Sequence, residues 1–228
     1  MPRELAIFPL PIVLFPGAIQ PLHIFEPRYR RLLADCLDGD RRFGINYVAD
    51  APSPDDPVPK PGQVGCIARI RETAALADGR SNIITEGERR YDLLEWVPGD
   101  HPYRVARVEE FDDFPEEAGE AESVAVGVRR DFSRLVAALA VLTDRPADPT
   151  PLPKDPTALS FHIAATLELD PQDKVTLLGL RSTIARLRRL AAVLAPLAAD
   201  GDRRAAVRVN ARGNGKSGLR PEIERRPP

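Results

Sequence analysis

The sequence contains few of the residues that build metal centres or covalent cross-links. Its 228 residues include only two cysteines and three histidines. Cys36 and Cys66 do not form a CxxC pair, and the histidines are too widely spaced for a zinc-type ligand motif. We therefore expect no metal site, and two small buried thiols rather than a disulfide. This cysteine usage does not indicate an oxidising compartment, so we expect a cytoplasmic protein.

Charge is missing from one long stretch near the start of the chain. Charged residues make up 29% of the sequence, yet none occurs from Leu5 to Phe25. A run of this length could span a bilayer, but its four prolines exclude a continuous helix, and no signal-peptide core or cleavage site follows. We expect a turn at Pro16-Gly17, with Gly17 at the third position of a type II turn. The stretch also predicts three buried strands, at residues 5–8, 12–15 and 18–25.

Basic residues are scarce relative to acidic ones until the end of the chain. Residues 201–228 hold eight basic and three acidic side chains, which gives this segment a charge of +5. Because the whole chain carries −2, the first 200 residues carry −7. A body of that charge repels a phosphate backbone, so we expect no nucleic-acid partner except through a flexible basic tail at 201–228.

The residues after the uncharged stretch alternate between helix and strand patterns. Residues 28–37 have apolar side chains at helical spacing, which predicts a short amphipathic helix: Tyr29, Leu32, Leu33, Cys36 and Leu37. Further strands are predicted within residues 43–111, with Asp78-Gly79 as a hairpin turn. We count about six to eight strands before residue 112, which predicts a closed or nearly closed antiparallel barrel.

The second half of the chain has helical patterns. An acidic stretch without basic residues, Glu109 to Glu122, predicts a solvated linker, with a metal or cation site as the alternative. Asp155-Pro156 and Asp170-Pro171 are each typical of a capped helix start. A last helix is predicted from about residue 181, and four such helices can form a small bundle. Its arginines are expected to point largely outward: Arg186, Arg188 and Arg189.

No complete catalytic or nucleotide-binding motif occurs. The sequence lacks GxSxG, HExxH and a glycine-rich dinucleotide fingerprint. GNGKS at 213–217 is similar to the end of a phosphate-binding loop, but Asn210 stands where that loop needs a glycine. His23 and His162 are interpreted as structural histidines, while His101 is in no motif. We therefore expect no catalytic, cofactor-binding or metal-binding residues, and no enzyme activity.

One segment carries a specific resemblance. FPLPIVLFPGAIQPLHIFEPRYRRLL resembles the N-terminal substrate-recognition domain of Lon-type ATP-dependent proteases, in which a Phe-Pro-Gly turn, a Pro-Leu-His strand and a Glu-Pro-Arg-Tyr helix start follow in this order. The similarity continues through Gly65, Asp78-Gly79 and Gly87 to Arg186-Leu187. It covers about residues 3–199.

The resemblance implies an α+β fold and a stand-alone form of this domain. The expected organisation is a PUA-like β pseudo-barrel at 1–112, a small helical bundle at 113–200 and the basic tail at 201–228. The ATPase and serine-lysine peptidase modules of the family do not fit after residue 199, which again argues against an enzyme.

The resemblance also implies that the protein binds unfolded or flexible polypeptide, as a substrate-recognition, adaptor or regulatory protein linked to proteolysis, with a protease as a further expected partner. Candidate contact residues are Phe25, Arg28 and Tyr29 at a strand-to-helix junction, and Trp96 beyond the hairpin. The alternative for the three aromatic residues is that they belong to the core. Two other functions stay open: an RNA-binding protein that uses the barrel and the tail, and a hydrolase without a recognisable motif.

Overall fold

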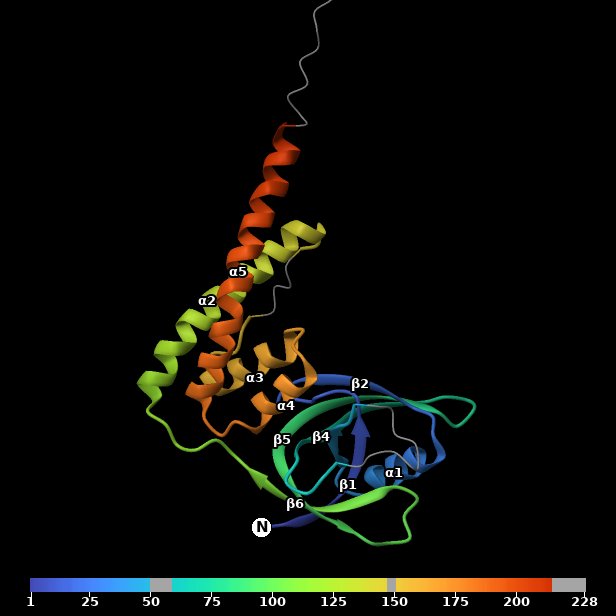
Figure 1. Cartoon of the computed structure of the whole chain (residues 1–228). Helices are drawn as coiled ribbons and strands as arrows, with labels where there is room; N and C mark the ends of the chain where they lie inside the picture. Colours follow the sequence, from blue (N-terminus) through green and yellow to red (C-terminus); the bar gives the residue numbers. More distant parts are fainter. Residues whose placement is uncertain (50–58, 147–150, 215–228) are drawn as a thin grey trace, which may run out of the picture. The chain divides into compact units, whose positions relative to one another are not determined.

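The computed structural model describes residues 1–49, 59–146 and 151–214 of the chain. Most of the proline-rich loop predicted at 51–62, and all but the start of GNGKS, lie outside these residues. The described ranges contain six strands and five helices (Figure 1). In chain order they are β1 (Arg3–Leu10), β2 (Ile19–Ile24), α1 (Pro27–Asp38), β3 (Arg42–Tyr47), β4 (Val64–Ala75), β5 (Ser81–Val97), β6 (Arg104–Phe111), α2 (Ala118–Thr143), α3 (Pro156–Thr166), α4 (Pro171–Gly179) and α5 (Thr183–Asn214).

Five of the described strands close into a barrel. The pairings run β5–β4–β3–β1–β6, and β6 returns to pair with β5. β2 lies outside this ring and pairs with the first part of β5. The expected α+β barrel is therefore confirmed, with one difference. β1 and β3 are parallel, because β2 and α1 form a crossover between them, whereas the other pairings are antiparallel.

The barrel interior is filled around one tyrosine. Tyr91 on β5 is fully buried, and its hydroxyl donates to the side-chain oxygen of Asn46 on β3. A Cβ atom at either Gly44 or Gly65 would lie 2.3 Å from Tyr91 atoms. These two glycines therefore make room for the ring. Apolar residues of four strands complete this cluster: Leu5, Ile7, Ile67, Leu93, Ala106 and Val108.

The turn before β2 has the predicted geometry. The amide of Ala18 donates to the carbonyl of Phe15 at 3.0 Å, and Gly17 has φ 77°. This is the type II pattern with proline second and glycine third. Gly17 and Ala18 together oppose Gly87 of β5: Gly17 donates to the Gly87 carbonyl at 2.8 Å, and Gly87 donates to the Ala18 carbonyl at 2.9 Å. A glycine-initiated β-bulge therefore begins the β2–β5 pairing.

The predicted strand at 12–15 is wrong. These residues form an irregular segment between β1 and the turn, although Leu14 and Phe15 are buried. Pro11 and Pro16 lack amide donors at its two ends, which leaves this short segment few groups with which to pair. Burial of Leu14 and Phe15 accounts for the apolar character of its second half.

The first helix and the cysteines agree with the sequence analysis. α1 buries Tyr29, Leu32, Leu33 and Cys36, and begins with proline. Leu37 differs, since it is 37% exposed. Cys36 and Cys66 are both free and buried.

Both predicted helix caps are confirmed. The Asp155 carboxylate accepts from the Ala158 amide at 2.7 Å at the start of α3. The Asp170 carboxylate accepts from the Gln172 amide at 2.8 Å at the start of α4. In each helix proline occupies the first turn, where no amide donor is needed.

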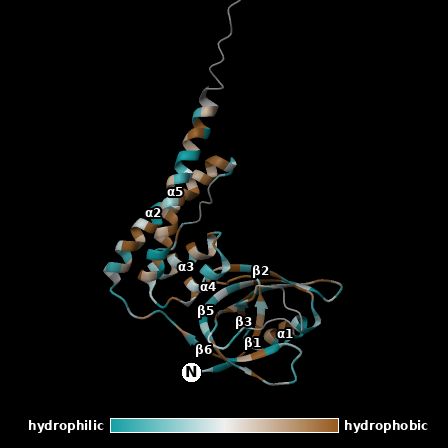
Figure 2. Ribbon diagram, in the orientation of Figure 1, coloured by the Kyte–Doolittle hydropathy of each residue, from teal (hydrophilic) through white to brown (hydrophobic). Residues whose placement is uncertain are grey.

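The described chain divides into two compact units. The first comprises Met1–Ala125 and Leu152–Leu190, and so holds the barrel together with α1, α3 and α4. The second comprises the described parts of Val126–Pro151 and Ala191–Pro228, which are the remaining lengths of α2 and α5. Figure 2 shows hydrophobic and hydrophilic segments alternating along both long helices. α5 continues to Asn214, so the first part of the segment expected to be a flexible tail is helical.

Candidate functional site

The outer face of the β2–β5 ladder carries a row of apolar side chains, of which those of Ile19 and Phe25 are exposed. The register pairs Ile19 with Glu86 and Pro21 with Ile84. Ile83 and Thr85, which alternate with Ile84 and Glu86 along β5, are buried. The side chains of these two register pairs therefore face away from the barrel interior. Phe25 follows the strand and stacks on His23, with 5.9 Å between ring centroids. Four residues make up this feature, which we call the β2 apolar row: Ile19, Pro21, Phe25 and Ile84.

Two members of the row are unusually open for apolar residues. Ile19 is 58% exposed and Phe25 is 57% exposed. Single exposed apolar residues are ordinary on a protein surface, whereas several on one strand face indicate a contact surface. Because β2 begins at Ile19 and Phe25 follows its end, the two are about 20 Å apart along an extended chain.

The polar groups beside the row are occupied by neighbours. Glu86 forms an ion pair with Arg71, and Glu26 forms one with Arg28 at 2.9 Å. A ring nitrogen of His23 lies 2.7 Å from the side-chain oxygen of Asn82, directly across the β2–β5 ladder. The surface around the row is therefore polar but locally charge-balanced.

A second candidate surface surrounds Trp96 on β5. A cavity of about 690 Å³ is lined by Trp96, His101, Tyr103 and Arg104, among other residues of the β5–β6 connection. The Arg104 guanidinium lies 5.7 Å from the Trp96 ring centroid, and the indole nitrogen donates to the Pro59 carbonyl at 3.1 Å. The indole also packs against the barrel cluster, so it is anchored on one side and accessible from the cavity on the other.

The structure separates the four candidate residues into different environments. Phe25 is exposed, whereas Tyr29 is only 4% exposed and stacks on Phe8, with 3.9 Å between centroids. Arg28 pairs with Glu26 and lies over the Tyr29 ring at 4.7 Å. Trp96 lies near the opposite end of β5 from the residues that pair with β2. Phe25 and Trp96 therefore belong to two separate surfaces.

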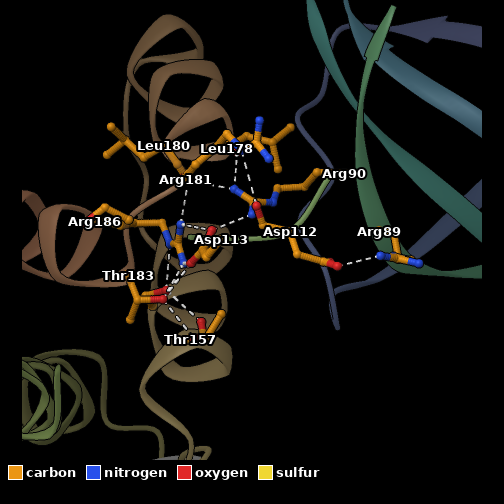
Figure 3. A network of polar contacts seen from close by, with 12 residues as sticks. Arg89, Arg90, Asp112, Asp113, Thr157, Leu178, Leu180, Arg181, Thr183 and Arg186 are labelled. Atoms are coloured by element: carbon orange, nitrogen blue, oxygen red, sulfur yellow. Dashed lines mark hydrogen bonds and ion pairs between the residues drawn. The ribbon is translucent and has the colours of Figure 1, made fainter. Parts of the chain in front are cut away.

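The most buried polar cluster joins the barrel to the helices within the first unit. Asp113, in the linker between β6 and α2, lies between Arg90 of β5 and Arg186 of α5 (Figure 3). The Arg186 side chain is 0% exposed, and its Nη2 donates to Asp113 at 2.6 Å. Thr183 donates its hydroxyl to the same carboxylate at 2.6 Å. Ser160 of α3 accepts from Arg186 Nε at 2.7 Å.

The guanidinium groups of Arg90 and Arg186 also donate hydrogen bonds to backbone carbonyls at the C-terminal end of α4. Arg90 donates to the carbonyls of Leu178 and Leu180, and Arg186 donates to that of Leu180 at 2.8 Å. Phe161 of α3 lies beneath both, with guanidinium carbons 5.0 Å and 3.9 Å from its centroid. This arrangement fixes α3, α4 and the start of α5 to β5.

Neighbouring charges and burial have opposite effects on the pKa of Asp113 in this cluster. Burial tends to raise the pKa of Asp113, but hydrogen bonds from Arg186 and Thr183 and the charges of Arg186 and Arg90 hold that pKa below its usual value. Burial also lowers the pKa of Arg90. The carboxylate is therefore ionised at neutral pH and balances part of the buried positive charge.

The sequence analysis missed this cluster. Arg186 was predicted to point largely outward, which is wrong: the outward-facing residues are its neighbours Arg188 and Arg189. Asp113 was assigned to a solvated linker but is 12% exposed. Glu116 of the same linker accepts from the Ile184 amide at 3.0 Å and so caps α5. One signal was present, since Arg186 falls on the same helical stripe as Leu190 and Leu194.

Neither a reactive thiol nor a metal-ligand cluster is present within the described residues. Burial raises the pKa of the Cys36 thiol to about 12 and that of Cys66 still further, so neither thiol is a nucleophile at neutral pH. No group of three or more histidine, cysteine, aspartate or glutamate side chains is placed to hold a metal ion in residues 1–49, 59–146 and 151–214. Within the same ranges, no helix is both long and apolar enough to span a bilayer.

Most of the chain is similar in sequence to one family of known proteins. Residues 4–195 match a family model described as the ATP-dependent protease La (LON) substrate-binding domain. The chain is 28% identical over 192 residues to Lon protease 2 of Herpetosiphon aurantiacus, an alignment that covers 84% of this chain and 23% of that protein. The chain therefore spans about a quarter of the length of this relative.

Two solved structures share the fold. The Lon N-terminal domain protein from Xanthomonas campestris aligns with a TM-score of 0.58 at 24% identity, over 83% of this chain and 98% of that one. The N-terminal domain of the Mycobacterium avium complex Lon protease aligns with a TM-score of 0.59 at 17% identity, over 87% and 99%. In both cases nearly the whole of the solved domain is matched.

Proposed function

Because the chain belongs to the LON substrate-binding domain family, whose model matches residues 4–195, we propose that it binds unfolded or flexible polypeptide without catalysing a reaction. In this role it acts as a substrate-recognition, adaptor or regulatory protein in proteolysis, with a protease as a further partner. The family model names a substrate-binding domain, and the relative with which this chain aligns is named as a protease. The family match is the observation that carries the proposal.

The surface of the first unit supports this proposal. The β2 apolar row and the Trp96 cavity each offer apolar contact area beside hydrogen-bonding groups, as peptide-binding surfaces do. Phe25, Arg28 and Trp96 are the candidate contact residues, and Tyr29 supports Arg28 from below. The acidic body of the chain, at −7 over residues 1–200, favours neutral or basic segments over nucleic acid.

A direct binding comparison tests the proposal. The full chain is titrated into a small fluorescently labelled protein in its native form and in its reduced and alkylated, unfolded form. We expect saturable binding to the unfolded form with a dissociation constant on the order of micromolar or weaker, because the bound segment must also be ordered.

The contrary results are equally clear. Equal, negligible binding to both forms contradicts the proposal. If the chain instead binds a labelled RNA tightly, with a steep salt dependence, the RNA-binding alternative replaces it. Release of peptide products or of phosphate from ATP contradicts the non-catalytic part.

A further inference from the structure

The first hydrogen-bonded pair between the turn and β5 shows which residues of β2 bond to β5 and which face the free edge. Gly87 exchanges hydrogen bonds with Gly17 and Ala18. Since bonded pairs alternate along an antiparallel ladder, Gln20, Leu22 and Ile24 form the next bonded pairs with β5. The main-chain groups of Ile19, Pro21 and His23 therefore point away from β5. Thr85 agrees with this phase, because its hydroxyl donates to the Gln20 carbonyl at 2.8 Å, on the β5 side.

The outer edge of β2 is blocked at its centre. β2 is the terminal strand of the described sheet, with β5 as its neighbour, so its far edge is the place where another strand could add. Pro21 has no amide hydrogen to offer there. Its carbonyl already accepts from the Gln20 side-chain amide at 3.0 Å. A strand added at this edge would lose the central amide hydrogen bond and would share the Pro21 carbonyl with Gln20, which disfavours binding by β-augmentation.

The side chains of β2 favour apolar side-chain contacts with a bound segment over strand addition. Ile19 and Phe25 are exposed at its two ends, and between them lie Pro21, the half-buried Ile84 of β5 and the hydrogen-bonded His23–Asn82 pair. The nearest carboxylates, Glu86 and Glu26, are paired with arginines, so the surface matches an uncharged segment better than a charged one. The separation of about 20 Å between Ile19 and Phe25 corresponds to about six residues of extended chain.

We propose that the β2 apolar row binds an extended, uncharged polypeptide segment through two bulky apolar side chains about six residues apart, and not by addition of a strand. The inference rests on the proposed function and specifies its site and its substrate class. Binding depends on the side chains of the segment and is insensitive to its backbone amides.

The test uses a short Ser- and Gly-rich fluorescent peptide with two phenylalanines about six residues apart. The full chain should bind it, and a copy N-methylated at alternate residues should bind within about twofold, because no strand pairing is lost. Ile19→Ser and Phe25→Ser should each weaken binding about tenfold, since each removes an apolar contact. Both residues are exposed, so the melting temperature should not change. Val209→Ser, at a similarly exposed site on α5, is the matched control and should bind as the parent does.

Two further measurements sharpen the test. Pro21→Val restores an outward amide hydrogen, and should make binding sensitive to N-methylation of the peptide. Trp96 is the only tryptophan of the chain, so intrinsic fluorescence reports on its cavity and should stay constant while the peptide binds at β2.

The outcomes separate the two proposals. Loss of binding on N-methylation shows strand addition and overturns the inference. Unchanged binding by Ile19→Ser and Phe25→Ser, or a change in Trp96 emission on binding, places the site elsewhere and overturns the inference alone. If sedimentation shows that these substitutions abolish self-association while peptide binding persists, the row holds a second copy and the inference is again overturned. Failure of the parent chain to bind any unfolded polypeptide contradicts the proposed function as well.

Discussion

Gly17 and Gly87 meet where the turn docks on β5, but they are needed for different reasons. Gly17 has φ 77°, and a Cβ there would have nothing within 4 Å. A Cβ at Gly87 would lie 2.2 Å from the Phe15 carbonyl oxygen. The first glycine therefore satisfies a backbone angle and the second a close approach.

Alanine substitutions distinguish the two reasons. Gly17→Ala should lower the free energy of unfolding by about 1–2 kcal/mol through backbone strain. Gly87→Ala should lower the free energy of unfolding by about 3 kcal/mol or more, because the added methyl group would push the Phe15 backbone away from β5. Urea denaturation monitored by Trp96 fluorescence measures both. A smaller loss for Gly87→Ala than for Gly17→Ala would contradict the assigned geometry.

Asp113 gives the protein a specific acid dependence. Its folded-state pKa is lowered because the bonds and charges of Arg186, Thr183 and Arg90 outweigh its burial, while its unfolded-state pKa is near the ordinary value of about 3.9. Its stabilising contribution is therefore complete above about pH 4 and is lost as the pH falls through the lower folded-state value.

Asp113→Asn should remove this dependence. The substitution leaves two buried guanidiniums without their carboxylate, and should destabilise by about 3–5 kcal/mol at pH 7. The free energy of unfolding should then change less between about pH 4 and pH 2 than in the parent chain. Asp100→Asn, at an exposed carboxylate, is the control. Parallel acid profiles for the parent and Asp113→Asn would show that Asp113 does not set the dependence.

At the scale of single elements, the two capped helices make the clearest stability prediction. Asp155→Ala and Asp170→Ala each remove one side-chain acceptor from a helix start, and each should cost about 1 kcal/mol. Because the caps belong to separate helices, the double substitution should cost about the sum. Thermal unfolding followed by circular dichroism measures all three variants. A cost near zero for either cap would contradict its assignment.

The elements themselves were largely predictable, because their signals are local. Proline after aspartate marked α3 and α4, and a period of 3.6 residues marked α1. The strand predicted at 12–15 does not form, although the segment is apolar. Burial makes a segment apolar whether or not it pairs, so apolar composition alone does not predict a strand.

At the scale of the whole molecule, the tertiary contacts were the part that local patterns left open. A helical stripe shows which residues face inward but not what they meet, so Arg186 was placed outside although it pairs with a residue of the β6–α2 linker. The candidate residues show the same limit. Phe25 and Tyr29 are close in sequence, yet one is exposed and one buried, and Trp96 belongs to another surface. The register of β2 on β5, which creates the apolar row, follows only from the assembled barrel.

The most direct test of the account is the affinity of the full chain for one labelled protein in its native and in its reduced and alkylated, unfolded form, measured by fluorescence anisotropy. We predict saturable binding to the unfolded form, with a dissociation constant on the order of micromolar or weaker, and no measurable binding to the native form. Equal affinity for the two forms, or no binding to either, would contradict the account.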